Sequence, residues 1–275
     1  MNTIQPHLYL LDRNAISLIK ETNAGKVQTE RKKIKFLSDL RSLDRAGSYF
    51  SAILSIIEGE HGKEDTAEEK AACQRKESES LRQFFKIARL DSDYLDSTSS
   101  TFAHIFTEHR EAGWERRGLF CTAAAPLITH PVKREKRRGL ESRLIAIAKD
   151  FKLEATEPTV VLALACVYGS EDARRVIKPA KFNAYNVLSD LQILSRINMI
   201  ASIGTDWNCS LQFTFLSMDS GLNGVLKHIK VLERNMTEGT LNLRFQYSGG
   251  LFPGLTQAEH IDLLHRLIDA NRPVE

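Results

Sequence analysis

The chain has 275 residues, of which 42% are hydrophobic and 27% charged, and its formal net charge is +3. This length allows a large buried core, and the composition is that of an ordinary soluble globular protein. The nearly neutral charge neither requires nor excludes a nucleic acid partner, because a local basic face can form on such a molecule.

Four cysteines, Cys73, Cys121, Cys166 and Cys209, are too widely spaced for a zinc knuckle or a redox dithiol. We expect buried or half-buried free thiols in a reducing compartment. The N-terminus lacks the basic region of a signal peptide, and the longest apolar stretch elsewhere, 158–168, is too short to span a bilayer. The predicted location is therefore cytoplasmic, without membrane contact.

Short apolar runs predict strands over 8–11 and 213–216, and alternation predicts another over 240–247. Helical spacing of apolar residues predicts helices over 28–47, 63–90, 102–120, 140–151, 187–203 and 256–268. The first strand runs into a helix start at 15–20. Segment 48–62 fits a helix better than a strand, 91–100 is a polar loop, and 158–168 is a buried helix or strand.

Strands that alternate with helices predict an α/β fold, with a central, mainly parallel sheet flanked by helices. We find no internal repeat and no low-complexity linker in the sequence. The chain is therefore predicted to form a single domain over 1–275.

Two of the predicted strands deliver an acidic residue at their carboxyl ends, Asp12 after the first and Asp219 after 213–216. Ligands bind at this edge of open parallel sheets. Carboxylates gathered there repel one another, and a divalent cation removes that repulsion. Mg²⁺ and Mn²⁺ prefer oxygen ligands and retain bound water, which suits phosphodiester hydrolysis.

Four segments resemble the motifs of the PIN-domain nucleases. YLLDRNAISLI is similar to the first, with Asp12 followed by Asn14, and FSAILSIIEGEHG to the second, with Glu58 and Gly62. LSDLQILSRINMI is similar to the third, which selects Asp190, and FTFLSMDSGL to the fourth, with Ser217 and Asp219. Relative to compact members of the family, the chain carries a long, largely helical insertion at about 63–157.

The resemblance implies a PIN-like fold and a metal-dependent endoribonuclease, of the kind found as toxins of toxin–antitoxin pairs or as defence effectors. It implies that Asp12, Glu58, Asp190 and Asp219 bind Mg²⁺ or Mn²⁺, with Asn14 and Ser217 in support. RNA is the expected substrate. The resemblance also allows a protein antitoxin or regulator as a partner, and it allows an oligomer. An inactive PIN-like scaffold that binds RNA or protein, and a nuclease that cuts branched DNA, stay as alternatives.

Each acidic residue also has a purely structural explanation. Asp12 suits the N-cap position of the helix that follows it. Asp190 or Ser189 suits the N-cap position of the helix predicted around them. Glu58 competes with Glu60, which follows two residues later, and Asp219 suits a turn. A fifth acid, Asp172, is better explained by a surface ion pair with Arg174 or Arg175.

Two basic clusters are candidates for contact with an RNA backbone, although a solvated loop explains the first equally well. The first is Lys133, Arg134, Lys136, Arg137 and Arg138. The second is Arg174, Arg175, Lys178 and Lys181. The second cluster precedes Asp190 closely in the sequence.

Overall fold

The computed structural model describes residues 6–59, 65–92, 113–206, 212–237 and 240–272. Two compact units are present, the first built from 1–110 with 193–219, the second from 111–192 with 220–275. The predicted insertion at 63–157 is divided between them. That the whole chain is one PIN-like domain with this insertion therefore stays a prediction.

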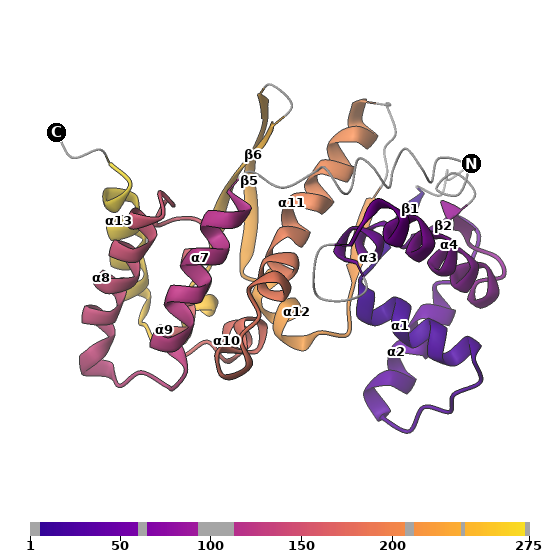
Figure 1. The fold of residues 1–275 in the computed structure, drawn as a ribbon, viewed down its shortest axis with the longest axis horizontal. Helices are drawn as coiled ribbons and strands as arrows, with labels where there is room; N and C mark the ends of the chain where they lie inside the picture. Colours follow the sequence, from indigo (N-terminus) through magenta and orange to yellow (C-terminus); the bar gives the residue numbers. More distant parts are fainter. Residues whose placement is uncertain (1–5, 60–64, 93–112, 207–211, 238–239, 273–275) are drawn as a thin grey trace. The chain divides into compact units, whose positions relative to one another are not determined.

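The first unit contains a four-stranded, all-parallel sheet with the strand order β3-β2-β1-β4. Its strands are β1 (His7–Leu11), β2 (Ser48–Ser51), β3 (Arg89–Leu90) and β4 (Gln212–Leu216). Its helices are α1 (Arg13–Asn23), α2 (Arg31–Ser42), α3 (Ile53–Glu58), α4 (Ala67–Phe84) and the second half of α11 (Ala184–Asp206). The prediction of a parallel α/β sheet flanked by helices is confirmed (Figure 1).

The central strand β1 is covered on both faces, as its unbroken apolar sequence predicts. Leu10 and Leu11 point to opposite faces of the sheet, and both are fully buried. The Leu11 face packs in one hydrophobic cluster with Ile16 of α1, Phe50 of β2 and Leu81 of α4. This cluster fixes the position of the carboxyl end of β1.

The segment after Gly47 differs from its predicted form. Ser48–Ser51 is a strand, and the helix begins only at Ile53. Tyr49 and Phe50 suit a pleated, half-buried surface, and alternation over four residues is too short to distinguish from a helical pattern. Helix α3 is therefore short and ends at Glu58.

The loop between α4 and β3 is held by one carboxylate. Asp44 accepts hydrogen bonds from the backbone N–H groups of Lys86, Ile87 and Ala88, at 2.8, 2.9 and 2.8 Å. Partial burial acts to raise the pKa of Asp44, but the three hydrogen bonds outweigh it and the pKa lies below 3.8. The ionised carboxylate thus favours the folded state.

Replacing Asp44 with Asn is expected to lower the free energy of unfolding of the first unit by about 1 kcal/mol at pH 7, because the contact is partly exposed to solvent. The difference from the wild type should be complete above about pH 4, the ordinary pKa of Asp, and should vanish as pH falls through the lowered pKa. Urea unfolding at several pH values measures it. Asp39→Asn on exposed α2 is the control, and an equal, pH-independent loss in both variants would contradict this account.

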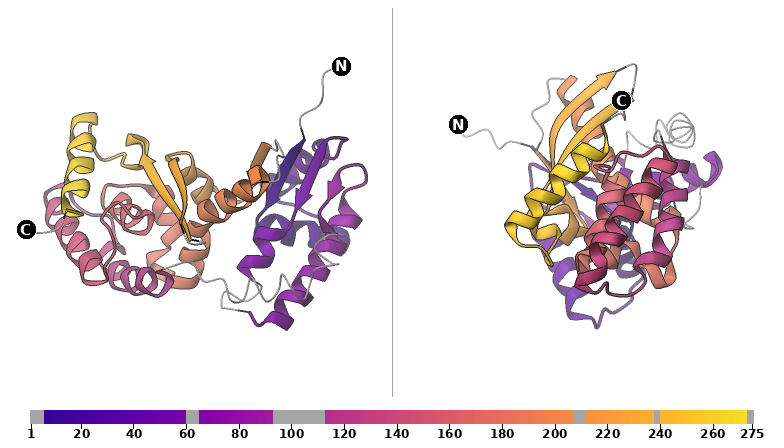
Figure 2. Two further views of the ribbon diagram at one scale, coloured as in Figure 1. Left: turned by 90° about the horizontal axis from the view of Figure 1, so that it is seen from above. Right: turned by 90° about the vertical axis from the view of Figure 1, so that its left-hand side faces the viewer.

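The second unit is mostly helical and also carries an antiparallel ribbon (Figure 2). Its α-helices are α7 (Trp114–Ala124), α8 (Arg134–Asp150), α9 (Pro158–Val167), α10 (Glu171–Ile177), the first half of α11, α12 (Ser220–Leu226) and α13 (Gln257–Ala270). The ribbon is β5 (Ile229–Thr237) and β6 (Thr240–Tyr247), and short 3₁₀ turns are η1 (Ala125–Ile128), η2 (Pro179–Lys181) and η3 (Gly249–Leu251). The predicted helix over 102–120 falls largely outside the described residues, and 158–168 is helical.

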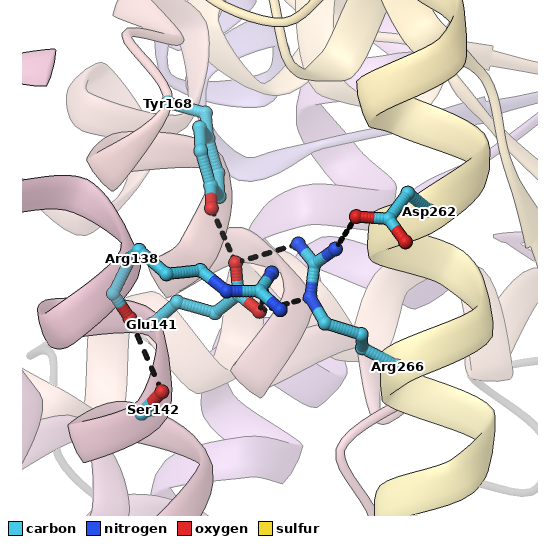
Figure 3. A network of polar contacts seen from close by, with 6 residues as sticks. All are labelled: Arg138, Glu141, Ser142, Tyr168, Asp262 and Arg266. Atoms are coloured by element: carbon cyan, nitrogen blue, oxygen red, sulfur yellow. Dashed lines mark hydrogen bonds and ion pairs between the residues drawn. The ribbon is translucent and has the colours of Figure 1, made fainter.

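A buried carboxylate ties three helices of this unit together. Glu141 of α8 is 1% exposed and accepts two hydrogen bonds from Arg266 of α13, at 2.7 and 2.9 Å. Arg138 adds a contact at 3.0 Å, and the Tyr168 hydroxyl, at the end of α9, donates a further hydrogen bond (Figure 3). Such a fully paired carboxylate is costly to disturb.

Cys73, Cys121 and Cys166 are buried free thiols, as predicted, whereas Cys209 lies outside the described residues. Burial raises the pKa of both Cys121 and Cys166 to about 12, so these two thiols stay protonated at neutral pH. Within the described part of the chain, no helix combines the length and apolar character needed to cross a membrane.

Candidate functional site

The candidate site lies at the carboxyl edge of the first unit's sheet, where β1 and β4 are neighbours. From β1 the chain continues to β2, which pairs with one edge of β1, whereas β4 pairs with its other edge. Such a reversal of strand order opens a crevice outside the strand ends, which is where open α/β sheets bind ligands. Asp12 follows β1 at this point, and Ser217 and Asp219 follow β4.

Asp12 is held from both sides. Its Oδ1 accepts a hydrogen bond from the backbone N–H of Ala15 at 2.7 Å, so Asp12 does cap α1. Its Oδ2 accepts a hydrogen bond from the Ser217 hydroxyl, whose oxygen in turn accepts one from the Asp219 N–H at 2.9 Å. A helix cap requires only the first of these contacts, so capping alone does not explain this arrangement.

The environment of Asp12 disfavours its negative charge. The side chain is buried, and burial raises its pKa to about 6, although hydrogen bonds from Ser217, Ala15 and Asn14 oppose the shift. The nearby charge of Asp219 raises the pKa further. A perturbed carboxyl in a crevice is a candidate functional group on physical grounds.

Glu58 shares the same electrostatic environment. Burial raises its pKa to about 7, and the charge of Asp12 contributes in the same direction. The positive charges of Arg13 and Arg196 oppose the shift. The competing Glu60, and Gly62 of the predicted motif, lie outside the described residues.

Asp190 occupies a different position from the one predicted. Helix α11 begins at Ala184, so Asp190 lies in its second turn, and neither Asp190 nor Ser189 caps the helix. Asp190 is half-buried and belongs to the second unit, so the first unit contributes three of the four predicted carboxylates. The half of α11 that belongs to the first unit contains two buried polar side chains, Arg196 and Asn198, which are 7% and 5% exposed.

Asp91 is a further acidic residue at the same sheet edge, which the sequence did not single out. It follows β3, its N–H donates to the Phe50 carbonyl at 3.4 Å, and its Oδ1 is buried with no hydrogen-bond partner in the described part of the chain. Burial raises its pKa to about 7, against the effect of a hydrogen bond with Ser51. Because β3 has only two residues, no strand pattern marked its end in the sequence.

Several of the predicted RNA-binding residues have structural tasks instead. Arg137 donates to the backbone carbonyls of Val132 and Gly254, at 3.2 and 3.1 Å, and Arg138 pairs with Glu141. Most of this first cluster lies in the opening turns of α8, so the segment is not a loop, although most of its basic side chains are solvated as that alternative expected.

The second basic cluster divides in the same way. Arg174 donates to the carbonyls of Ile128, Thr129 and Cys166, so its guanidinium is used within the unit. Arg175 pairs with Asp172 at 3.4 Å, which confirms the ion pair predicted for that acid. The exposed lysines of the two clusters are Lys133, Lys136, Lys178 and Lys181.

The first unit offers oxygen donors of the type that Mg²⁺ and Mn²⁺ prefer, from Asp12, Glu58 and Asp219. A carboxylate has about four lone-pair sites, so the hydrogen bonds from Ala15, Ser217 and Asn14 leave Asp12 able to accept a further ligand. Within the described ranges, however, no three His, Cys, Asp or Glu side chains are grouped closely enough to hold a metal ion. The donor chemistry fits the cation, and convergence of the four carboxylates on one ion stays a prediction.

Comparison of the chain with protein-family models, with curated proteins and with solved structures yields no match in any of the three.

Proposed function

We propose that the protein is a metal-dependent endoribonuclease of the PIN-like type, whose site is the carboxyl edge of the first unit's sheet. The observation that carries the proposal is the burial of Asp12 between β1 and β4, in electrostatic contact with both Glu58 and Asp219. Two strand ends far apart in sequence thus place acidic groups at the point where an open sheet binds ligands.

A cation site would explain why Asp12 is buried within the electrostatic influence of Glu58 and Asp219, at a cost to its charged form. The charge of Asp219 raises the pKa of Asp12, the charge of Asp12 raises the pKa of Glu58, and a bound Mg²⁺ or Mn²⁺ would offset that repulsion. When bound, such a cation activates water for attack on a phosphodiester and stabilises the charged phosphorus centre. Asp12, Glu58 and Asp219 of the first unit would hold it.

Asn14 and Ser217 have the supporting role in this proposal. The Ser217 hydroxyl links the Asp12 carboxylate to the backbone N–H of Asp219, and Asn14 hydrogen-bonds to the same carboxylate. Partners of this kind orient a ligand and fix which lone pairs face a cation.

The experiment that tests the proposal is cleavage of single-stranded RNA by the purified full chain, with Mn²⁺ or with a chelator. We expect cleavage with Mn²⁺, loss of cleavage on chelation, and much slower cutting of branched DNA. Cleavage that is unchanged in the presence of the chelator would contradict the proposal, and faster cutting of branched DNA would assign the site to DNA instead.

We also propose that exposed lysines hold the RNA backbone, in particular Lys178 and Lys181. Each phosphate contact on a single strand contributes about 0.7 to the slope of log K against log salt. Replacing both lysines with Gln should lower RNA affinity regardless of sequence and reduce that slope by up to about 1.4. Arg175→Gln, which removes an exposed ion pair, is the control, and an unchanged slope in the double variant would exclude the two lysines.

A second candidate function is an inactive PIN-like scaffold that binds RNA or a regulatory protein, such as an antitoxin. It is favoured by the lack of a ready-made cluster of three metal-binding side chains in the described parts of the chain. In that case RNA binding should persist in the presence of a chelator and in Asp190→Asn. Metal-dependent cleavage of RNA by the wild type would exclude it.

A further inference from the structure

Helix α4 has a buried face that is polar. Lys70, Gln74, Glu77 and Ser78, spaced so that they share one side of the helix, are between 0% and 3% exposed. An amphipathic helix normally buries apolar side chains, and burying charged groups has a cost that must be offset by specific contacts. The partners of these side chains therefore indicate why the face is polar.

Two of these side chains contact α3, the helix that ends at Glu58. Glu77 Oε1 accepts a hydrogen bond from the Ser55 hydroxyl at 2.8 Å, and Lys70 Nζ donates to the Ile57 carbonyl at 3.1 Å. Ile57 is the immediate neighbour of Glu58, and Ser55 lies one turn before it. Both anchors of α4 thus act on the turn that carries the Glu58 carboxylate.

Helix α3 depends on such anchors. It has six residues, and its N-cap, Ala52, makes no side-chain hydrogen bond. Helices this short are not stable without tertiary contacts. At its other end, Gly59 has φ +81°, and a Cβ there would lie 2.5 Å from Asp65 Oδ2, so only glycine fits.

The environment of Glu77 argues against a role in stability alone. Its Oε1 also accepts from the Cys73 thiol at 3.3 Å and lies 3.5 Å from Lys20 Nζ. Its Oε2, however, is buried and has no hydrogen-bond partner among the described residues. A buried carboxylate with one orphaned oxygen is a poor source of stability, and apolar packing would serve the fold better.

We propose that Glu77 and Lys70 are positioning residues, which hold α3 so that the Glu58 carboxylate is presented at the sheet edge beside Asp12 and thereby set the affinity of the site for a divalent cation. This inference rests on the proposed function. It assigns the polar face of α4 to the site, although none of its residues lies at a strand end.

The test compares Ser55→Ala and Glu77→Gln with matched variants on the exposed side of α4, Ser80→Ala and Glu79→Gln. Mn²⁺ affinity of the full chain is measured by electron paramagnetic resonance, and the unfolding midpoint is measured without added metal. Loss of an orienting partner typically lowers metal affinity 10- to 100-fold. We expect at least a roughly 10-fold loss in the first pair, little change in the second, and similar midpoints in all four.

The outcomes separate the inference from the proposed function. If the wild type binds Mn²⁺ and both Ser55→Ala and Glu77→Gln bind it equally well, the positioning role is wrong and the proposed function stands. If the wild type binds no Mn²⁺, the proposed function is wrong and the inference falls with it. If affinity falls only in proportion to a lowered unfolding midpoint, the contacts are structural and the inference is overturned.

Discussion

Replacement of Asp12 with Asn is expected to slow Mn²⁺-dependent RNA cleavage at least about 100-fold, while the fold is retained. The Asn oxygen can still accept the Ala15 N–H, so the helix cap is preserved and the negative charge alone is lost. Loss of a partner that only orients a metal ligand lowers metal affinity or activity by up to about 100-fold, and loss of the ligand itself should lower them at least as much. Initial rates at saturating Mn²⁺ measure the effect.

Asp39→Asn is the matched control, because it removes an exposed carboxylate of α2 that pairs with Lys35 on the surface. Its cleavage rate should equal that of the wild type. If Asp12→Asn cleaved RNA as fast as Asp39→Asn, Asp12 would be no more than a helix cap, and the proposed site would be wrong.

The largest expected effect on stability comes from Glu141. Replacing it with Leu leaves Arg266 buried without its main partner, which costs about 3 to 5 kcal/mol for a fully buried pair. Arg266 is one-fifth exposed and also contacts Asp262, so we expect about 3 kcal/mol, the lower end of that range. Denaturant unfolding followed by Trp114 fluorescence, in a Trp207→Phe background, reports on the second unit.

A double variant distinguishes an uncompensated charge from lost packing. Glu141→Leu with Arg266→Leu should regain part of the lost stability, because no charge is left buried. Arg134→Gln, which breaks an exposed pair with Glu259, should cost less than about 1 kcal/mol. A loss below 1 kcal/mol in Glu141→Leu itself would mean that the network in Figure 3 contributes little.

The sequence predicted the core of the first unit because β1 and β4 are short, mostly apolar runs that are each followed by an acid. It did not resolve β2 from α3, because a four-residue strand merges into apolar helical positions with only Ala52 between them. It also missed Asp91, since a strand of two residues leaves no pattern. In both cases the strand was not recognised because it is too short to produce a pattern, and not because of the hydrophobicity of its residues.

The candidate site was predictable only in part. Asp12 and Asp219 were singled out because each follows an apolar strand, whereas Ser217 was selected by the motif resemblance alone. The true start of α11 at Ala184 was not recognised, and a residue in the second turn was taken for one near the helix start. Composition identified the basic clusters, but it cannot reveal that Arg137 and Arg174 donate to carbonyls inside their own unit.

The polar face of α4 was hidden in the sequence for a related reason. A stretch rich in Lys, Glu, Gln and Ser is typical of a solvated helix surface, so its composition gives no sign of burial. Burial of Lys70 and Glu77 depends on contacts with α3, which is distant enough in sequence that no local pattern predicts it. Such burial becomes informative only once the fold is known.

If acids from separate strand ends share one cation, as we propose, Mn²⁺ titration of the full chain should reveal it. We expect saturable, stoichiometric binding by the wild type, and a loss of affinity of at least about 100-fold in both Asp12→Asn and Asp219→Asn. Mn²⁺ that binds equally to all three proteins, or to none of them, would contradict this proposal.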